Sequence, residues 1–208
     1  MTTAFLYKRD PTLARVSARV GAGQVLQSGT VLGRINLGEV ASSAGAGNVG
    51  DGTIGLHVEP RTWHCKVGRY WIECVTEVPG GGVFRVTDPA GFDIGYVAAG
   101  EEHSRGIRFT VTAGAVDFRL RDHFTVTVAK GSGRLVQLDP AGVDGRQTPA
   151  AILAEDVDTT EGELIAYVIG RPGSVIHRAA LTWPEGYTDL QKAAALQELD
   201  ANGIRTIY

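Results

Sequence analysis

A regular alternation of apolar and polar residues runs through the middle of the chain. Residues 107–112 place Ile, Phe and Val at every second position, with Arg and Thr between them, and residues 116–121 and 124–128 repeat the pattern. A period of two puts successive side chains on opposite faces of a β-strand. Each segment is therefore predicted to be a strand with one buried and one solvated face, as in an antiparallel sandwich or barrel.

Glycine- and proline-rich turns separate these strands. About six strands fit between residues 53 and 128, enough for a small all-β domain. Residues 37–53 are too rich in Gly, Ala and Ser to pack, so they are predicted to be the junction into this domain, and residues 130–133 return the chain from it. The turn signals are Val67-Gly68, Pro79-Gly80-Gly81-Gly82, Asp88-Pro89-Ala90-Gly91 and Ala113-Gly114.

One convincing helix is predicted, near the C-terminus. Thr188 can cap it and Gln191 stands at the capping-box position, while residues 193–199 supply helix formers and an apolar stripe. Asn202-Gly203 is a typical helix end, and residues 204–207 favour a last strand. These patterns predict a mainly β chain with one C-terminal helix.

Composition agrees with a chain of many short strands. The 208 residues include 28 glycines and only one Met, with aromatic residues at 7%, which favours turns and strands over packed helices. The length suits one large or two small domains. No run approaches the roughly 20 apolar residues of a membrane span. Residues 1–7 are too few for the apolar core of a signal peptide, so synthesis in the cytoplasm without export by that route is expected.

Charge is unevenly distributed. The net charge is −3, which gives no reason to expect nucleic-acid binding, but residues 1–20 alone carry +3 and leave −6 for the rest. We expect these residues to form a flexible arm. Within the arm, Arg15, Val16, Arg19 and Val20 alternate, so this piece is expected to become a strand on an acceptor edge, with the valines on one side and the arginines on the other.

Candidate catalytic and metal-binding residues are sparse. Cys65 and Cys74 are expected to remain free thiols, because their spacing from His57 and His64 fits no zinc signature. Residues 155–163 are acidic but lack the glycine of a calcium loop, and a solvated hairpin connection is predicted instead. The sequence therefore predicts no catalytic residue, no metal and no cofactor.

Four segments of the last third, read in order, carry a resemblance. They are a strand ending in Leu-x-Asp (residues 133–139), an apolar strand with small residues (149–155), a hairpin strand (163–169) and a Leu-x-Trp-Pro corner (180–185). Together they resemble the head decoration protein D family of lambda-like tailed phages. Residues 25–35 are similar to the family's opening strand. The resemblance implies a split decoration-protein core, residues 21–38 and 132–208, interrupted by residues 39–131 as an inserted β-sandwich-like domain.

The resemblance also implies a function. It predicts a capsid decoration, or cement, protein and not an enzyme: a homotrimer that binds the major capsid protein at three-fold or quasi-three-fold sites outside the expanded head and stabilises it. The protein would then reside on the outer surface of the virion, with no nucleic acid or membrane as partner. Residues 1–20 become the capsid-binding arm, which is expected to order on the capsid by adding a strand to a sheet edge of the shell protein. Leu181, Trp183 and Pro184 become candidates for the core or the trimer interface, with the core favoured for Trp183.

Two other functions remain open at this point. The inserted domain could be a recognition module that binds a host-surface glycan or protein, because sugar faces stack on aromatic rings. The aromatic residues that would serve this purpose are Trp63, Tyr70, Trp71 and Tyr96. A hydrolase with a β-sandwich fold is the third alternative, although no catalytic motif supports it.

Overall fold

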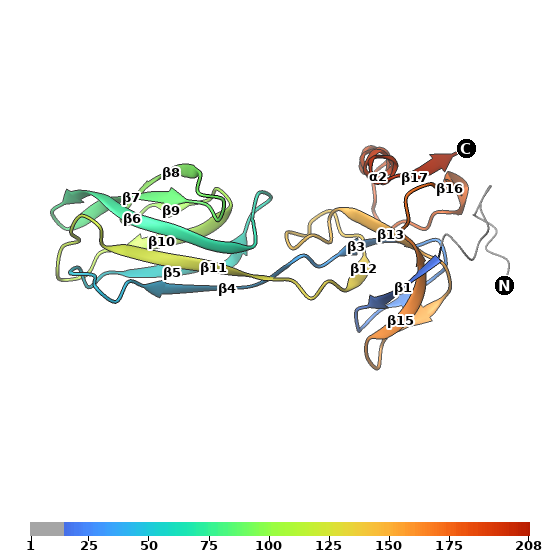
Figure 1. Cartoon of the computed structure of the whole chain (residues 1–208), viewed down its shortest axis with the longest axis horizontal. Helices are drawn as coiled ribbons and strands as arrows, with labels where there is room; N and C mark the ends of the chain where they lie inside the picture. Colours follow the sequence, from blue (N-terminus) through green and yellow to red (C-terminus); the bar gives the residue numbers. More distant parts are fainter. Residues whose placement is uncertain (1–14) are drawn as a thin grey trace. The chain divides into compact units, whose positions relative to one another are not determined.

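The computed structural model describes residues 15–208 and divides them into two compact units (Figure 1). Residues up to Asn36 and Ser132–Tyr208 form the first, here called the barrel unit, and Leu37–Gly131 form the second, the sandwich unit. Both units are built mainly of β-strands, and α2 (Asp189–Ala201) is the α-helix of the described residues. The predicted fold class is therefore confirmed. No helix among residues 15–208 is long and apolar enough to span a membrane.

Five strands close the barrel, and their inward side chains form its core. Val20, Leu32, Leu135 and Leu153 are fully buried in this interior cluster. Alternation along each strand directs every second residue inward, as a closed barrel requires. The strand order around the barrel is β1 (Arg15–Val20), β12 (Leu135–Gln137), β3 (Val31–Arg34), β13 (Pro149–Leu153) and β15 (Leu164–Ile169).

Strand β1 corrects the prediction that the flexible arm extends to residue 20. Arg15–Val20 pairs in antiparallel register with β15 along all six residues, and Val20 also pairs with Leu135 of β12. The acceptor edge expected for this segment thus lies within the same chain. Burial of Val16 and Val20 against the barrel core offsets the entropy of ordering the strand. Residues 1–14 of the predicted arm lie outside the described residues.

The C-terminal segment covers the barrel with a second layer, in which Figure 1 shows α2, β16 (Ser174–His177) and β17 (Ile204–Ile207) together. The predicted capping box of α2 is present, because Thr188 and Gln191 satisfy each other's backbone N–H groups. The predicted last strand forms as β17 and runs parallel to β16. A short 3₁₀ helix, η1 (Arg178–Ala180), follows β16. Buried residues of this layer and of the barrel wall form one cluster: Val31, Leu138, Ile152, Ile169, Ile176, Leu181, Leu199 and Ile204.

The acidic residues 155–163 do connect two apolar strands, β13 and β15, as predicted, but they are more than a solvated hairpin. They contribute β14 (Val157–Asp158), which pairs with β2 (Val25–Leu26), and Val157 is buried. Asp156 accepts a hydrogen bond from the Ser28 backbone N–H at 2.7 Å. The carboxylates therefore fix backbone turns, which explains their density without a metal ion.

The sandwich unit contains eight strands, and seven of them, β5 to β11, lie in the region where about six were predicted. Figure 1 labels the sheet β4-β11-β6-β7-β8 and the sheet β5-β10-β9, and their facing side chains form one core. The alternating segments 107–112 and 124–128 lie in β10 and β11, as predicted. The strand bounds are β4 (Leu37–Ala44), β5 (Thr53–Arg61), β6 (Gly68–Val78), β7 (Gly81–Thr87), β8 (Asp93–Ala98), β9 (Glu102–His103), β10 (Ile107–Thr112) and β11 (His123–Lys130).

Residues 116–121 were wrongly predicted to be a strand. They form a loop in which Phe118 alone is buried, in edge-to-face contact with Phe84 at 5.0 Å between ring centroids. Side-chain carboxylates bind the backbone N–H groups that a strand would direct to a neighbour. The pairs are Asp51 with Val116, Asp122 with Arg119, and Glu77 with Leu120.

The predicted junction at residues 37–53 was also partly wrong, because it contains β4. This strand forms one edge of the five-stranded sheet and is paired with β11. Its small side chains are mostly exposed, so backbone pairing stabilises it more than apolar burial does. The Ser43 and Thr125 hydroxyls add a cross-strand hydrogen bond of 2.7 Å.

Candidate functional site

The outer surface of β1 and β15 carries exposed apolar and basic side chains side by side. Because alternate residues point inward, Arg19 lies opposite Ile165 and Ser17 opposite Tyr167 on the outside of the barrel. Ile165 is 64% exposed and Tyr167 is 50% exposed. We call this surface, formed by Arg15, Ser17, Arg19, Ile165 and Tyr167, the β1–β15 face. Two large exposed apolar side chains bordered by arginines are typical of a surface that contacts another protein.

A three-residue charge cluster lies at one end of this face. Glu163 accepts a hydrogen bond from the Arg19 guanidinium at 2.9 Å and forms an ion pair with Arg134. Hydrogen bonding to Arg134, with a smaller contribution from Arg19, holds the pKa of Glu163 below its usual range. The carboxylate thus stays ionised at neutral pH and joins the end of β1 to residues just before β12.

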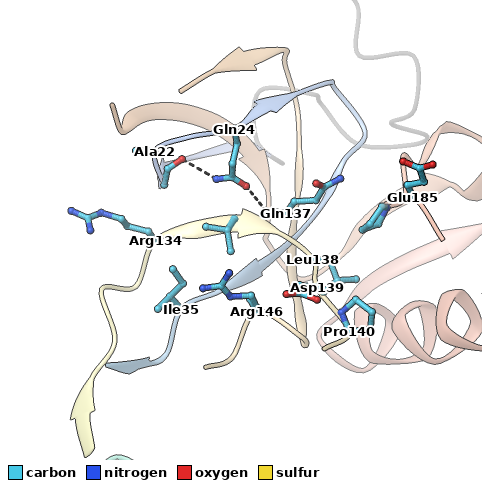
Figure 2. A pocket seen from close by; sticks show the side chains of 13 residues that line it. Ala22, Gln24, Ile35, Arg134, Gln137, Leu138, Asp139, Pro140, Arg146 and Glu185 are labelled. Carbon is cyan, nitrogen blue, oxygen red and sulfur yellow. Dashed lines mark hydrogen bonds between the residues drawn. The ribbon is translucent and has the colours of Figure 1, made fainter. Parts of the chain in front are cut away.

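The surface of the barrel unit next to this cluster contains a hollow, which Arg134 helps to line. The cavity has a volume of about 690 Å³, and Figure 2 shows Arg134, Arg146, Asp139 and Glu185 around it. Apolar atoms of Ile35, Val136 and Leu138 also line it. A hollow with mixed charge and an apolar part suits a protein segment better than a compact small molecule.

Internal hydrogen bonds hold the walls of the hollow in place. Gln24 donates to the Gly21 carbonyl oxygen at 2.9 Å and accepts from the Gln137 backbone N–H at 2.8 Å (Figure 2). Arg146 binds both carboxylate oxygens of Asp144 at 2.7–3.1 Å. Hydrogen bonding to Asp144 raises the pKa of the Arg146 guanidinium. The side chains are thus held in fixed positions, which lowers the entropy lost when a partner binds.

The Leu-x-Trp-Pro corner, predicted to be core or trimer interface, lies between the barrel and its C-terminal layer. Leu181 is buried, and Trp183 is half-buried against the same apolar cluster and stacks on Tyr187 at 5.6 Å. Pro184 lines the hollow. The backbone of Thr182 bonds that of Gly29 and Val31, so the corner is fastened to the start of β3.

The four aromatic residues singled out in the inserted region have different environments. Trp63 and Tyr96 are 68% and 61% exposed. Trp71 is half-buried and stacks on His123 at 4.1 Å. Tyr70 is fully buried and its hydroxyl accepts a hydrogen bond from the Lys66 backbone N–H, so its ring face is covered by the sandwich core and is not free to stack on a ligand. Inward alternation along β6 places it in the sandwich core.

Cys65 and Cys74 are free thiols. Burial raises the pKa of both thiols, which makes each a poor nucleophile and a poor metal ligand at neutral pH. Among residues 15–208, no three His, Cys, Asp or Glu side chains lie close enough to hold a metal ion. The arrangement of the described side chains supports binding to another surface.

Sequence reasoning missed Ile165 and Tyr167. Residues 163–169 are apolar at almost every position, so they suggest a strand buried on both faces. The available signal was the alternation of the smaller Ala166 and Val168, which point inward, with the larger Ile165 and Tyr167. Ala166 and Val168 join the leucines of the other strands in the barrel interior, and the pleat of β15 therefore directs Ile165 and Tyr167 outward.

The barrel unit presents exposed apolar and basic side chains on a closed β scaffold, an arrangement that suits a structural binding protein. The particular family follows from sequence comparison: the model of the family "Bacteriophage lambda head decoration protein D" matches residues 2–204. The chain therefore belongs to this family of structural phage capsid proteins, and its place is the capsid of the virion. The match extends across the sandwich unit, so the resemblance seen in the last third holds for nearly the whole chain.

Similarity to other proteins is slight. No curated protein matches the chain. Two crystal structures of Xanthomonas campestris FlgL, in space groups H3 and C2, match at 17% and 18% identity with TM-scores of 0.34 and 0.33. They cover 50% and 49% of this chain, which spans 33% of each FlgL chain.

Proposed function

We propose that this protein is a cement protein of the phage head. It binds the major capsid protein on the outside of the expanded shell, as a homotrimer at three-fold or quasi-three-fold sites, and stabilises the shell without catalysis. The observation that carries the proposal is the family match over residues 2–204. Membership of the family does not by itself give the binding site on the shell, the oligomeric state or the stabilising role. These three points are what we propose.

The β1–β15 face is the capsid contact in this proposal. Ile165 and Tyr167 supply apolar area, and Arg15 and Arg19 supply positive charge for acidic residues of the shell. Strand β1 itself belongs to the barrel, so residues 1–14 are the part of the chain left to act as an arm. Three such contacts on one trimer raise avidity by roughly 10²–10⁴ over a single contact. Each contact can therefore be weak while the trimer remains attached.

The candidates for the core or the trimer interface are assigned from their positions in the barrel unit. Leu181 and Trp183 act in the core of the barrel unit, where they pack against the helix layer. Pro184 and the hollow beside it face the neighbouring subunit of the trimer. The sandwich unit is not needed for attachment.

Exchange of the exposed apolar side chains tests the capsid contact. We expect Ile165→Ser with Tyr167→Ser to leave the fold and the trimer unchanged, because both side chains are exposed, and to reduce the occupancy of undecorated expanded heads at least tenfold. The matched control is Val25→Ser with Tyr208→Ser, which removes two side chains that are 70% and 95% exposed in the same unit. Occupancy is measured by cosedimentation, and the oligomeric state by mass photometry.

Two results would contradict this assignment. If the variant Ile165→Ser with Tyr167→Ser occupies heads as well as wild type does, the β1–β15 face does not touch the shell. Conversion to monomers would place the face between subunits instead. In addition, attachment is expected to weaken as salt is raised, because the proposed contact between arginines and shell carboxylates is screened.

A further inference from the structure

Three loops of the sandwich unit meet around a small pocket that the capsid role does not use. Its volume is about 170 Å³, comparable with one sugar ring, and it lies wholly within this unit. The loops are residues 62–66, 88–93 and 104–106. The residues that line the pocket are His64, Lys66, Tyr70, Asp88, Asp93, Ile94, Arg105 and Gly106.

Each loop is bonded to the other two. Lys66 of the first forms an ion pair of 2.5 Å with Asp88 of the second, whose carboxylate is buried. The Thr62 backbone N–H donates to the Gly106 carbonyl oxygen at 3.3 Å, which joins the first loop to the third. Arg105 of the third reaches the carbonyl oxygen of Ile94, just after the second, at 3.4 Å. The pocket is therefore formed before any ligand arrives, which lowers the entropy cost of binding.

Exposed aromatic residues lie next to, or two positions from, lining residues of this pocket in the sequence. The Lys66 ammonium lies 5.8 Å from the centre of the Phe92 ring, which places that ring beside the pocket. Trp63 precedes the lining residue His64 and is 68% exposed, and Phe92 precedes Asp93 and is 67% exposed. Tyr96, 61% exposed, is hydrogen-bonded to the Asp93 carboxylate. Among residues 15–208, only Tyr167 and Tyr208 are further aromatic residues among the exposed large apolar side chains. Such a concentration of exposed aromatic area is typical of a binding site.

Polar groups inside the pocket remain available to a ligand. The His64 ring makes no hydrogen bond within the described residues, and Arg105 is exposed with one long hydrogen bond. Asp93 is exposed beside them; its Oδ1 accepts a hydrogen bond from the Gly95 backbone N–H at 3.0 Å, and the carboxylate keeps further acceptor positions for a ligand. The formal charges of the lining residues balance, because Lys66 and Arg105 oppose Asp88 and Asp93. A ligand with many hydroxyl groups and no net charge fits this lining better than an anion does.

We propose that this pocket binds a single neutral sugar residue of a surface glycan. A sugar presents hydroxyl groups at its edge and a flat array of C–H groups on its face, so it needs donors, acceptors and an aromatic ring together. His64, Asp93 and Arg105 supply the first two, and Trp63 or Phe92 supplies the ring. A protein partner would need an apolar centre and about 800 Å² of buried surface on each side, whereas this pocket is small and four charged side chains line it: Lys66, Asp88, Asp93 and Arg105.

NMR titration of the full chain tests the proposal. The probes are glucose, galactose, mannose and N-acetylglucosamine, each with its methyl glycoside, and galacturonic acid as the anionic comparison. We expect at least one neutral probe to shift the Trp63 indole N–H signal and to saturate. Trp63→Ala or Phe92→Ala is expected to weaken that binding about tenfold, as observed through backbone signals of residues 88–106. The control Tyr167→Ala, an exposed aromatic exchange in the barrel unit, is expected to bind like wild type.

Other outcomes would overturn the proposal. One is that no neutral probe shifts any signal, and another is that galacturonic acid alone binds. The third is that Trp63→Ala and Phe92→Ala both fold and bind the neutral sugar with wild-type affinity. Head occupancy provides an independent measure: Trp63→Ala is expected to decorate heads normally. Failure of the capsid role and failure of the sugar site are therefore distinguishable.

Discussion

Val20 of β1 lies opposite Leu135 of β12, and this parallel pair closes the barrel. Both side chains are fully buried in the barrel interior. The N-terminal strand is thus part of the core of the folded unit. A variant lacking residues 1–20 would lose the barrel together with the arm, so only removal of residues 1–14 can test the arm by itself.

The first prediction concerns β1. Val20→Ala is expected to lower the free energy of unfolding by about 2 kcal/mol, because it removes buried methyl groups and leaves a cavity. Ser17→Ala, on the exposed side of the same strand, is expected to change it by less than about 0.5 kcal/mol. Chemical denaturation followed by circular dichroism measures both. A variant lacking residues 1–20 that unfolds at the same denaturant concentration as one lacking residues 1–14 would refute the role given to β1.

The second prediction uses a close backbone approach in the barrel. A methyl group added at Gly33 would lie 2.1 Å from the carbonyl oxygen of Arg146, which is backbone and cannot move alone. Gly33→Ala is therefore expected to destabilise the protein by about 1–3 kcal/mol. Gly170→Ala is the matched control, because its new methyl group would have only ordinary contacts of 3.6 Å or more. Equal melting temperatures for the two variants would argue against this packing.

The third prediction concerns pH and Asp122, whose carboxylate is buried in the sandwich unit. Burial by itself raises its pKa, but hydrogen bonds from the backbone N–H groups of Arg119, Val49 and Gly50 outweigh that effect and lower it. A carboxylate with a lowered folded-state pKa stabilises the protein above its unfolded pKa of about 3.9, and the contribution is lost as pH falls through the folded value. Acid is therefore expected to destabilise this unit.

Asp122→Asn tests that expectation, because the neutral amide cannot accept the same bonds at both positions. The variant is expected to be less stable than wild type at pH 7, with a difference that shrinks as pH falls below about 4. The indole N–H signal of Trp71, which stacks on the adjacent His123, reports unfolding of this unit. A difference that stays constant from pH 7 to pH 3 would contradict the assigned ionisation.

Short sequence patterns were sufficient to predict the elements whose signal lies in neighbouring residues. The alternation in residues 107–112 and 124–128 predicted β10 and β11, and Thr188 with Gln191 predicted the start of α2. The order of the last four segments was sufficient to recognise the family. For these strands and for the helix start, the deciding pattern lies in a few neighbouring residues, although the strands pair with distant partners.

Elements that depend on distant partners were predicted less well. Residues 15–20 looked like an arm because they are basic and terminal, and the edge that orders them is β15, nearly 150 residues away. Residues 116–121 alternate like a strand, but Asp51 and Glu77 bind their backbone N–H groups. The pocket proposed to bind sugar is likewise assembled from three separate loops. Of its lining and the aromatic residues next to it, only Tyr70, Trp63 and Tyr96 were singled out as recognition residues from the sequence.

The last prediction is that the sandwich unit can be removed. Its first and last strands pair at Leu37 and Lys130, so the ends of the unit lie together. In the barrel unit, Ile35 exchanges backbone hydrogen bonds of 2.9 and 3.0 Å with Gly133 and Arg134, which holds its two chain ends together as well. Replacing residues 37–131 by two glycines is therefore expected to leave the barrel intact, because a short loop closes these ends at little entropic cost.

The shortened variant is expected to give the barrel signals of the full chain in NMR, to remain an oligomer and to occupy expanded heads with wild-type affinity. Calorimetry should show the loss of one unfolding transition, that of the sandwich unit. A variant with a folded barrel that fails to decorate heads would make the sandwich unit part of the capsid contact. Unfolding of the shortened chain would show instead that the barrel needs its insert for stability, and a second variant that restores β4 and β11 as a hairpin would then locate the missing contacts.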